Sequence, residues 1–295
     1  MSSPRSAANA MGVIHDIGYQ PYTGPRLGRR HLVGALYAYR LRAVFGLSRS
    51  GRYKVVPYFL LTLMCLPAVV SAAVTTIAHI QGLQYGGYAY YLQVVAVLFL
   101  AAQASQLVTT DLRFRVLPLY FSRPLSRSDC ALTTLGAMAT GMVILMGAPV
   151  ILLYAGALLG LVHGPHDVLV ETGHVLAGLA GVLLSALVLS ALALAATSFS
   201  RRRAFAVLAV IAPYLVIAST VSIIEGVSRG SAAGSVAGLF SPFDLLQGAQ
   251  IWLLGAPRVF PAVPGPLGPL YVLVAAATLA AAAGVLLVRY RRIDL

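Results

Sequence analysis

The fold is decided by residues 55–110, which read VVPYFLLTLMCLPAVVSAAVTTIAHIQGLQYGGYAYYLQVVAVLFLAAQASQLVTT. No Asp, Glu, Lys or Arg interrupts this stretch. A segment rich in Gly, Tyr and Gln, 79–91, divides it into two apolar runs, 55–77 and 90–110. Because an α-helix crosses about 30 Å of hydrocarbon with about 20 residues, each run is long enough to span a membrane. We therefore predict two transmembrane helices here.

Four further uncharged runs follow, at 131–162, 173–199, 204–224 and 270–288. Runs of this length exceed the roughly 10 residues of a membrane β-strand and lack its alternation, which excludes a membrane barrel. The composition agrees, since a chain that is 59% hydrophobic and 10% charged has too little polar surface for a water-soluble globule of this size. The predicted fold class is an all-α integral membrane protein with six transmembrane helices.

The positive charges predict the orientation. Nineteen of the twenty-one Lys and Arg residues lie before the first run or after the second, fourth and sixth runs, and only Arg229 and Arg258 lie elsewhere. Basic residues near span ends stay on the cytoplasmic side, so both termini are predicted to be cytoplasmic. A basic inner face beside anionic membrane lipid also accounts for the net charge of +13, and no nucleic-acid partner is expected.

Three segments flank or interrupt the spans. Residues 1–30, rich in Ser, Gly, Pro and Arg, are predicted to form a cytoplasmic amino-terminal arm. Residues 31–54 are predicted to form an amphipathic interfacial helix and its lead-in, lying either in the headgroup plane or on the protein's own inner surface. Residues 239–254 are apolar but too short and too broken to span, which predicts a re-entrant segment before the last helix. The remainder, 55–295, is predicted to be one transmembrane domain.

Two amides lie in the second span, at Gln103 and Gln106. An amide in hydrocarbon is costly unless it is hydrogen-bonded or hydrated. These side chains are therefore expected to face other helices, where they would hydrogen-bond, or to line a transport route. Both interpretations remain open at this point.

The sequence lacks several catalytic signatures. It contains one lysine, Lys54, which follows Tyr53, so it has no Gly-Lys pair from which to build a P-loop for ATP. No cysteine and histidine set has metal-ligand spacing, and no Gly-x-Ser-x-Gly or His-Glu-x-x-His motif is present. The titratable groups within or bordering the spans are expected at different depths: Cys65, His79, Asp111, Glu171, His174 and Glu225. We expect no catalytic residue, metal or cofactor in this chain.

The loop after the second span mixes apolar and basic residues in a pattern typical of a docking surface. Asp111 ends the span, and the loop closes with Ser122-Arg123-Pro124-Leu125-Ser126-Arg127. This arrangement resembles the membrane subunits of the ABC-2 exporter family. The amino-terminal residues 15–19 and 24–28 look like one actinobacterial-type branch of that family. The six spans, the interfacial helix and the re-entrant segment match the same family over nearly the whole chain.

The resemblance implies a function. The loop would be the coupling helix, seated on a dimer of separately encoded ATP-binding subunits that hold the ATP and Mg. Two membrane subunits, alike or different, would enclose the route in a bacterial cytoplasmic membrane. The coupling residues it implies are Asp111, Arg113, Arg115, Pro118, Ser122, Arg123, Pro124, Ser126 and Arg127.

Other interpretations compete with this one. The four arginines of the loop also satisfy the positive-inside rule without any partner. A channel or one half of a secondary transporter would show inverted repeats and charges at the membrane midplane, and neither is found. A membrane enzyme or scaffold would show a cluster of titratable groups at one depth, and the sequence indicates none.

Overall fold

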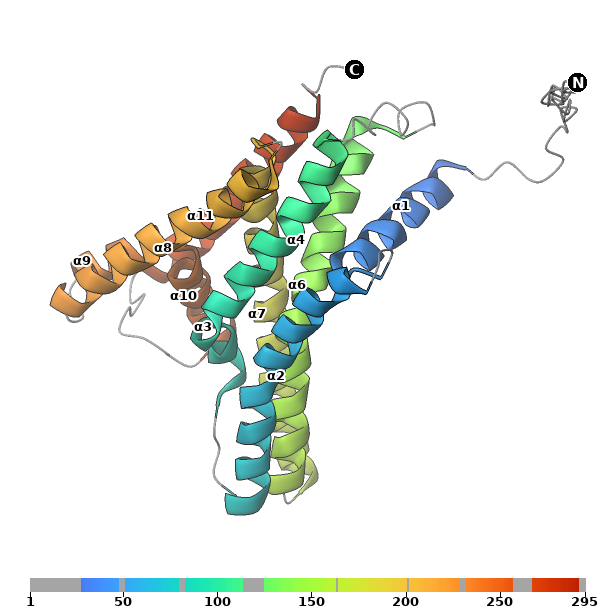
Figure 1. The fold of residues 1–295 in the computed structure, drawn as a ribbon. Helices are drawn as coiled ribbons and strands as arrows, with labels where there is room; N and C mark the ends of the chain where they lie inside the picture. Colours follow the sequence, from blue (N-terminus) through green and yellow to red (C-terminus); the bar gives the residue numbers. More distant parts are fainter. Residues whose placement is uncertain are drawn as a thin grey trace, which may run out of the picture.

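The computed structural model describes residues 28–47, 51–79, 83–113, 125–162, 164–200, 202–228, 232–256 and 267–291. These residues form helices joined by short turns, with no β-strand among them (Figure 1). In chain order the helices are α1 (Arg29–Val44), α2 (Arg52–Ala78), η1 (Tyr85–Gly87), α3 (Tyr88–Tyr91), α4 (Gln93–Arg113), α6 (Arg127–Gly160), α7 (Pro165–Thr197), α8 (Arg203–Ser228), α9 (Ala232–Gly238), α10 (Pro242–Leu254) and α11 (Gly268–Arg291).

Five helices are each long and apolar enough to cross a membrane: α2, α6, α7, α8 and α11. A sixth crossing is available if the pair made by residues 85–91 and α4 counts as one broken span. The chain therefore has the helices of a multi-pass membrane protein. The predicted amino-terminal arm lies outside the described residues except for its last three.

The second span differs from the straight helix expected over 90–110. Its two parts are bent by 65°, and Leu92 separates them. Two tyrosines just before the bend are anchored on other helices: Tyr88 donates a hydrogen bond to the carbonyl of Met64 in α2, and Tyr90 donates one to Asp244 in α10. These anchors fix the direction of α3 independently of α4, and hydropathy carries no sign of them.

Two helices are longer than the apolar runs that predicted them. α6 has 34 residues and α7 has 33, or about 50 Å each at 1.5 Å per residue. α7 begins at Pro165, eight residues before the predicted start at 173. The prediction began too late because the first turns of α7 carry Asp167 and Glu171, which lie outside any uncharged run. A run chosen for the absence of charge stops at such residues, whereas a helix continues past them.

α6 lies at the centre of the bundle and packs against α1, α2 and α7. Its buried face carries Met138, Met142, Leu145 and Met146, all but inaccessible. At its far end α6 approaches α2 so closely that a Cβ at Gly156 would lie 2.5 Å from the Cβ of Ala72. Small residues at such crossings are the usual means of tight helix packing in membranes.

α1 packs on α6 through part of its surface. Leu36, Ala43 and Val44 are buried there, and the Tyr37 hydroxyl lies 2.7 Å from that of Thr140. The amphipathic helix predicted within 31–54 is therefore only partly covered by the rest of the protein, and its Tyr39 is exposed. The turn to α2 contains Gly46 at φ +66°, where a side chain would also strike the backbone of Tyr53.

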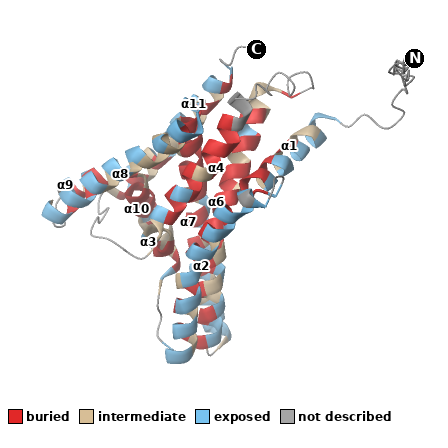
Figure 2. Ribbon diagram, in the orientation of Figure 1, coloured by how far each residue is buried: buried red, intermediate tan, exposed pale blue. Residues whose placement is uncertain are grey.

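α8 is the least covered helix of the bundle, and Figure 2 shows most of its length exposed. Its outward residues are apolar, with Val216, Ile223 and Val227 each about two-thirds or more exposed. After α8 come the short helices α9 and α10. α10 covers most of the segment 239–254 that was predicted to be re-entrant, and it packs on α11. With 13 residues, α10 is about 20 Å long, too short to cross a membrane.

We predict that Gly156→Ala separates α2 from α6. The added methyl group would overlap Ala72, and overpacking of this kind typically costs about 1–3 kcal/mol. Thermal unfolding of the purified protein should show the loss. The matched control is Gly173→Ala in α7, where no atom lies within 4 Å and stability should be unchanged or slightly higher. Equal melting temperatures for the two variants would contradict the close packing.

Candidate functional site

Most of the predicted coupling loop lies outside the described residues: Arg115, Pro118, Ser122, Arg123 and Pro124. Asp111 and Arg113 fall in the last turn of α4. Of the coupling residues named from the sequence, Ser126 and Arg127 have described side chains, and both lie where the loop enters α6. The candidate site is therefore built from the start of α6 and the elements around it.

Ser126 is the N-cap of α6 and forms a capping box with Asp129. The Ser126 Oγ accepts a hydrogen bond from the Asp129 backbone N–H at 3.1 Å, and an Asp129 carboxylate oxygen accepts from the Ser126 N–H at 3.0 Å. Each side chain thus satisfies a backbone donor that the helix start leaves free. The Asp129 carboxylate is also favoured by the positive end of the α6 dipole.

Arg29, at the start of α1, grips the same carboxylate. Its Nε and Nη2 donate to the two oxygens of Asp129 at 2.9 and 2.8 Å, a bidentate pair that fixes orientation as well as distance. The carboxylate raises the pKa of the Arg29 guanidinium, through the hydrogen bond first and the charge second. Because Arg29 is 61% exposed, the pair contributes geometry more than stability.

Two more arginines, Arg127 and Arg289, connect the end of α11 with the start of α6 and the end of α7. Arg127 donates a hydrogen bond to the carbonyl of Arg291, the last residue of α11. Arg289 lies over the ring of Phe199, 5.6 Å from its centroid, and its Nε donates to the Ser198 carbonyl at 3.4 Å, beyond the end of α7. We call this assembly of Arg29, Ser126, Arg127, Asp129 and Arg291 the basic corner.

The two amides of α4 are buried inside the bundle. Gln103 is 3% exposed and Gln106 is 7% exposed, and α4 packs chiefly on α7 and α8. Neighbouring hydroxyls bond to the helix itself, as Thr109 does when it donates to the Ser105 carbonyl at 2.6 Å. The amides thus lie between helices. Their surroundings are compatible with both uses, helix contact and route lining.

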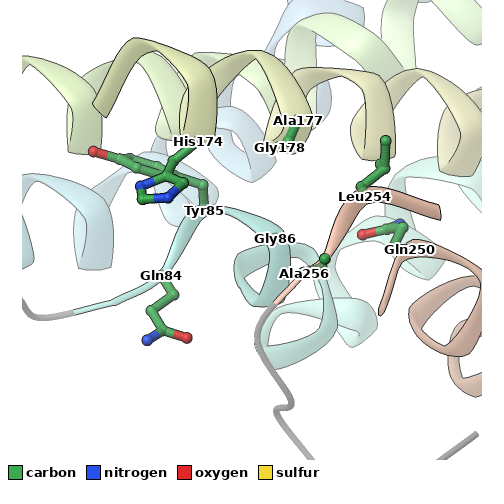
Figure 3. A pocket seen from close by; sticks show the side chains of 10 residues that line it. Gln84, Tyr85, Gly86, His174, Ala177, Gly178, Gln250, Leu254 and Ala256 are labelled. Carbon is green, nitrogen blue, oxygen red and sulfur yellow. The ribbon is translucent and has the colours of Figure 1, made fainter. Parts of the chain in front are cut away.

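A cavity of about 240 Å³ lies beside α7, far from the basic corner, and is drawn in Figure 3. Its polar lining comes from Gln84, Tyr85, His174 and Gln250. Tyr85 donates a hydrogen bond to Glu171, and the Nδ1 of His174 lies 3.7 Å from the same carboxyl group. The cavity could hold a small polar group. No local sequence pattern predicts this cavity, because its walls come from three separate segments.

The fold brings together two acidic residues that no sequence pattern connects. Glu225, near the end of α8, and Asp244, in the first turn of α10, are both buried at the junction of α8, α9, α10 and α11. Glu225 was among the titratable groups expected near span ends, and its neighbour Asp244 comes from the segment predicted to be re-entrant. The signal available in the sequence was the charge inside the apolar stretch 239–254, whose partner could not be identified there.

Comparison of the chain with protein-family models and with curated proteins finds no match.

Removal of the N-cap should loosen the first turn of α6. Ser126→Ala is predicted to cost about 0.5–2 kcal/mol, the usual range for a lost N-cap. Hydrogen–deuterium exchange of the peptide around 125–134 should speed up. The control is Arg29→Gln, which leaves the capping box intact and should change this exchange much less. Faster exchange in the control than in Ser126→Ala would show that α1, and not the cap, holds the turn.

Gln250→Ala should detach α10 from α7. The Gln250 Nε2 donates to the Ser185 Oγ at 2.8 Å and to the Gly181 carbonyl at 3.2 Å, and its loss leaves buried acceptors without a donor. The expected cost is about 1–3 kcal/mol by thermal unfolding. Gln84→Ala, an exposed amide on the same cavity, is the matched control and should leave the melting temperature unchanged. Similar losses in both variants would refute the assignment.

Proposed function

We propose that this chain is the membrane-spanning subunit of an ATP-driven ABC exporter in a bacterial cytoplasmic membrane. It would form the translocation route with a second membrane subunit, and a separate dimer of ATP-binding subunits would supply the ATP and Mg. The proposal rests on the resemblance of 111–127 to the ABC-2 family and on the absence of a Gly-Lys pair from the sequence. A chain without a P-loop needs a partner if ATP is to drive it.

The observation that carries the proposal is the basic corner. The loop that would receive the ATP-binding subunit ends at Ser126. At this point side-chain hydrogen bonds connect the start of α6 with the start of α1 and the end of α11. A displacement of this loop would move the start of α6 directly, α1 through Arg29, and the end of α11 through Arg127. A coupling device needs such a connection, because a push on a loose loop would not reach the spans.

In this mechanism the partner subunits close on ATP and press the loop of each membrane subunit. The two bundles then shift between an inward-open and an outward-open form. ATP can drive this shift only if the closed ATP-binding dimer fits one form better than the other. The capping box keeps the first turn of α6 helical when the loop is pressed. A displacement of the loop is then transmitted along the 34-residue helix.

The uncovered face of α8 is available for the pairing of two membrane subunits. A lipid-facing helix and a subunit interface are equally apolar, so the exposure of Val216 and Ile223 suits either neighbour. The buried amides of α4 lie next to α8. A route between two subunits would therefore have polar groups close to its wall.

A second candidate is one half of an ATPase-independent secondary transporter. The buried pair Glu225 and Asp244 favours it, since intramembrane carboxyl groups commonly serve ion or proton coupling. This candidate requires no ATP-binding partner. The two proposals therefore differ in what should be recovered with the chain.

We predict that the chain, tagged in its native host and solubilised in mild detergent, is recovered with a P-loop ATPase. The variant Arg123→Glu should lose the ATPase, because it reverses a charge in the middle of the docking loop. The matched control is Arg202→Glu, the same change on the exposed turn before α8, which should keep it.

Mass spectrometry of the purified complexes decides between the candidates. An ATPase that is present with the wild type and the control but lost with Arg123→Glu supports the exporter. If no ATPase is recovered with the wild type in several mild detergents, the exporter proposal fails and the secondary transporter takes its place.

A further inference from the structure

A buried carboxyl group without a partner lies near the end of α8. Glu225 is 4% exposed, and its Oε1 has no hydrogen-bond partner. A buried carboxylate with no donor or cation is among the most costly groups a protein can contain, and such a group is neutralised instead of staying charged. Since no described residue donates to this oxygen, a bound proton is the simplest way to neutralise Glu225.

A glycine of α9 lies beside this oxygen. A Cβ at Gly238, the last residue of α9, would lie 3.5 Å from the Glu225 Oε1, 3.6 Å from the Cβ of Asp244 and 2.8 Å from the hydroxyl of Tyr271. The two carboxyl groups thus flank the same point from α8 and α10. Tyr271 reaches it from α11, where its hydroxyl donates to the Ser235 carbonyl at 2.5 Å.

Asp244 has stabilising neighbours that Glu225 lacks. It lies in the first turn of α10, where the helix dipole favours a negative charge. The hydroxyl of Tyr90 donates to its Oδ1 at 2.6 Å. Glu225 has the opposite placement, since it lies three residues from the end of α8, where the dipole disfavours a negative charge. The two acids are therefore unequal, and a single proton belongs on Glu225.

Among the described residues, the other ionisable groups around the pair include no cation. α3 contributes Tyr90, α8 itself contributes Tyr214, α11 contributes Tyr271, and the sequence of α9 contains no ionisable side chain. Neither carboxylate forms an ion pair with any described residue.

More distant groups lie on the neighbouring helices. The charged residues of α4 and the arginines of α11 lie at the opposite ends of those helices, and α7 carries Asp167, Glu171 and His174 in its first three turns. Arg229 follows α8 and lies outside the described residues.

We propose that Glu225 is a proton-binding site, held next to a charged Asp244 in the junction of α8, α9, α10 and α11. The ligand is a single proton, taken up from the side of the membrane opposite the basic corner. The bound proton removes the like-charge repulsion between the two acids and lets α9 and α10 pack on α8. This inference stands whether or not the chain is an exporter subunit.

Infrared spectroscopy of the full chain in lipid nanodiscs tests the proposal directly, because a protonated carboxylic acid has its own carbonyl band. The wild type at pH 6 should show a band that is lost in Glu225→Gln. Glu171→Gln is the matched control: it removes a partly buried acid of α7 that already accepts a hydrogen bond from Tyr85, and it should keep the band. A band of the same intensity in wild type and Glu225→Gln would overturn the proposal.

Thermal unfolding against pH provides the second test. The wild type should lose stability as the pH rises and Glu225 gives up its proton. Glu225→Gln resembles the protonated form, so it should fold and should not show this loss. Asp244→Asn removes the neighbouring negative charge, which makes it easier for Glu225 to lose its proton. In this variant the Glu225 band should disappear at a pH about one unit or more lower than in the wild type.

Two further results would contradict the site. His174→Gln must keep the wild-type pH dependence, because a change there would assign the titration to the cavity beside α7. Arg229→Gln must also leave the band unchanged. If the band of Glu225 rose in Arg229→Gln, the arginine would be the natural counter-ion and the proton site would be refuted.

Discussion

Inside hydrocarbon, a polar group that finds no partner within the protein finds none at all, and this constraint organises the whole chain. It makes every long segment a helix, because only a helix satisfies its backbone within one segment. It also explains why hydroxyls turn back on their own helices, as Thr75 does on the Ser71 carbonyl at 2.9 Å and Thr134 on the Cys130 carbonyl at 2.6 Å. The helix ends obey the same rule, through the Ser126 cap at one end of α6 and the contact of His79 with the Gly160 carbonyl, 2.5 Å, at the other.

The constraint also accounts for the bend in the second span. Tyr85, Tyr88 and Tyr90 lie within six residues, and their hydroxyls donate to α7, α2 and α10 respectively. A straight helix would direct these side chains around one axis and would not reach all three neighbours. The short η1–α3 segment interrupts the span and in return forms hydrogen bonds to three other helices. The bend is thus a consequence of hydrogen bonding, and hydrophobicity alone gives no account of it.

Hydropathy predicted the long helices, which depend only on the length of apolar runs. It did not predict the helix ends or the contacts between distant side chains. The long helices follow from runs such as 131–162, since about 20 apolar residues suffice to cross a membrane wherever they occur. The helix starts were predicted less well. Asp129 and Asp167 end an uncharged run, yet an acidic residue in the first turn stabilises a helix. The basic corner was only half visible: Ser126 and Arg127 were named from the motif, whereas Arg29 lies 100 residues from Asp129 and shares no local pattern with it. Gln103 and Gln106 were identifiable because an amide among apolar residues stands out by itself.

Glu225 is the exception to the constraint, and the exception carries information. The protein has found partners for Asp244, Glu171 and Asp129, each through a hydroxyl, a backbone N–H or an arginine. The same means were available at Glu225, since Tyr271 lies close to it, yet the Tyr271 hydroxyl donates to the Ser235 carbonyl instead. Glu225 thus places a buried carboxyl group where no described residue donates to its Oε1. Unlike an amide, a carboxyl group in that position can bind and release a proton, and this is the property that its surroundings leave available.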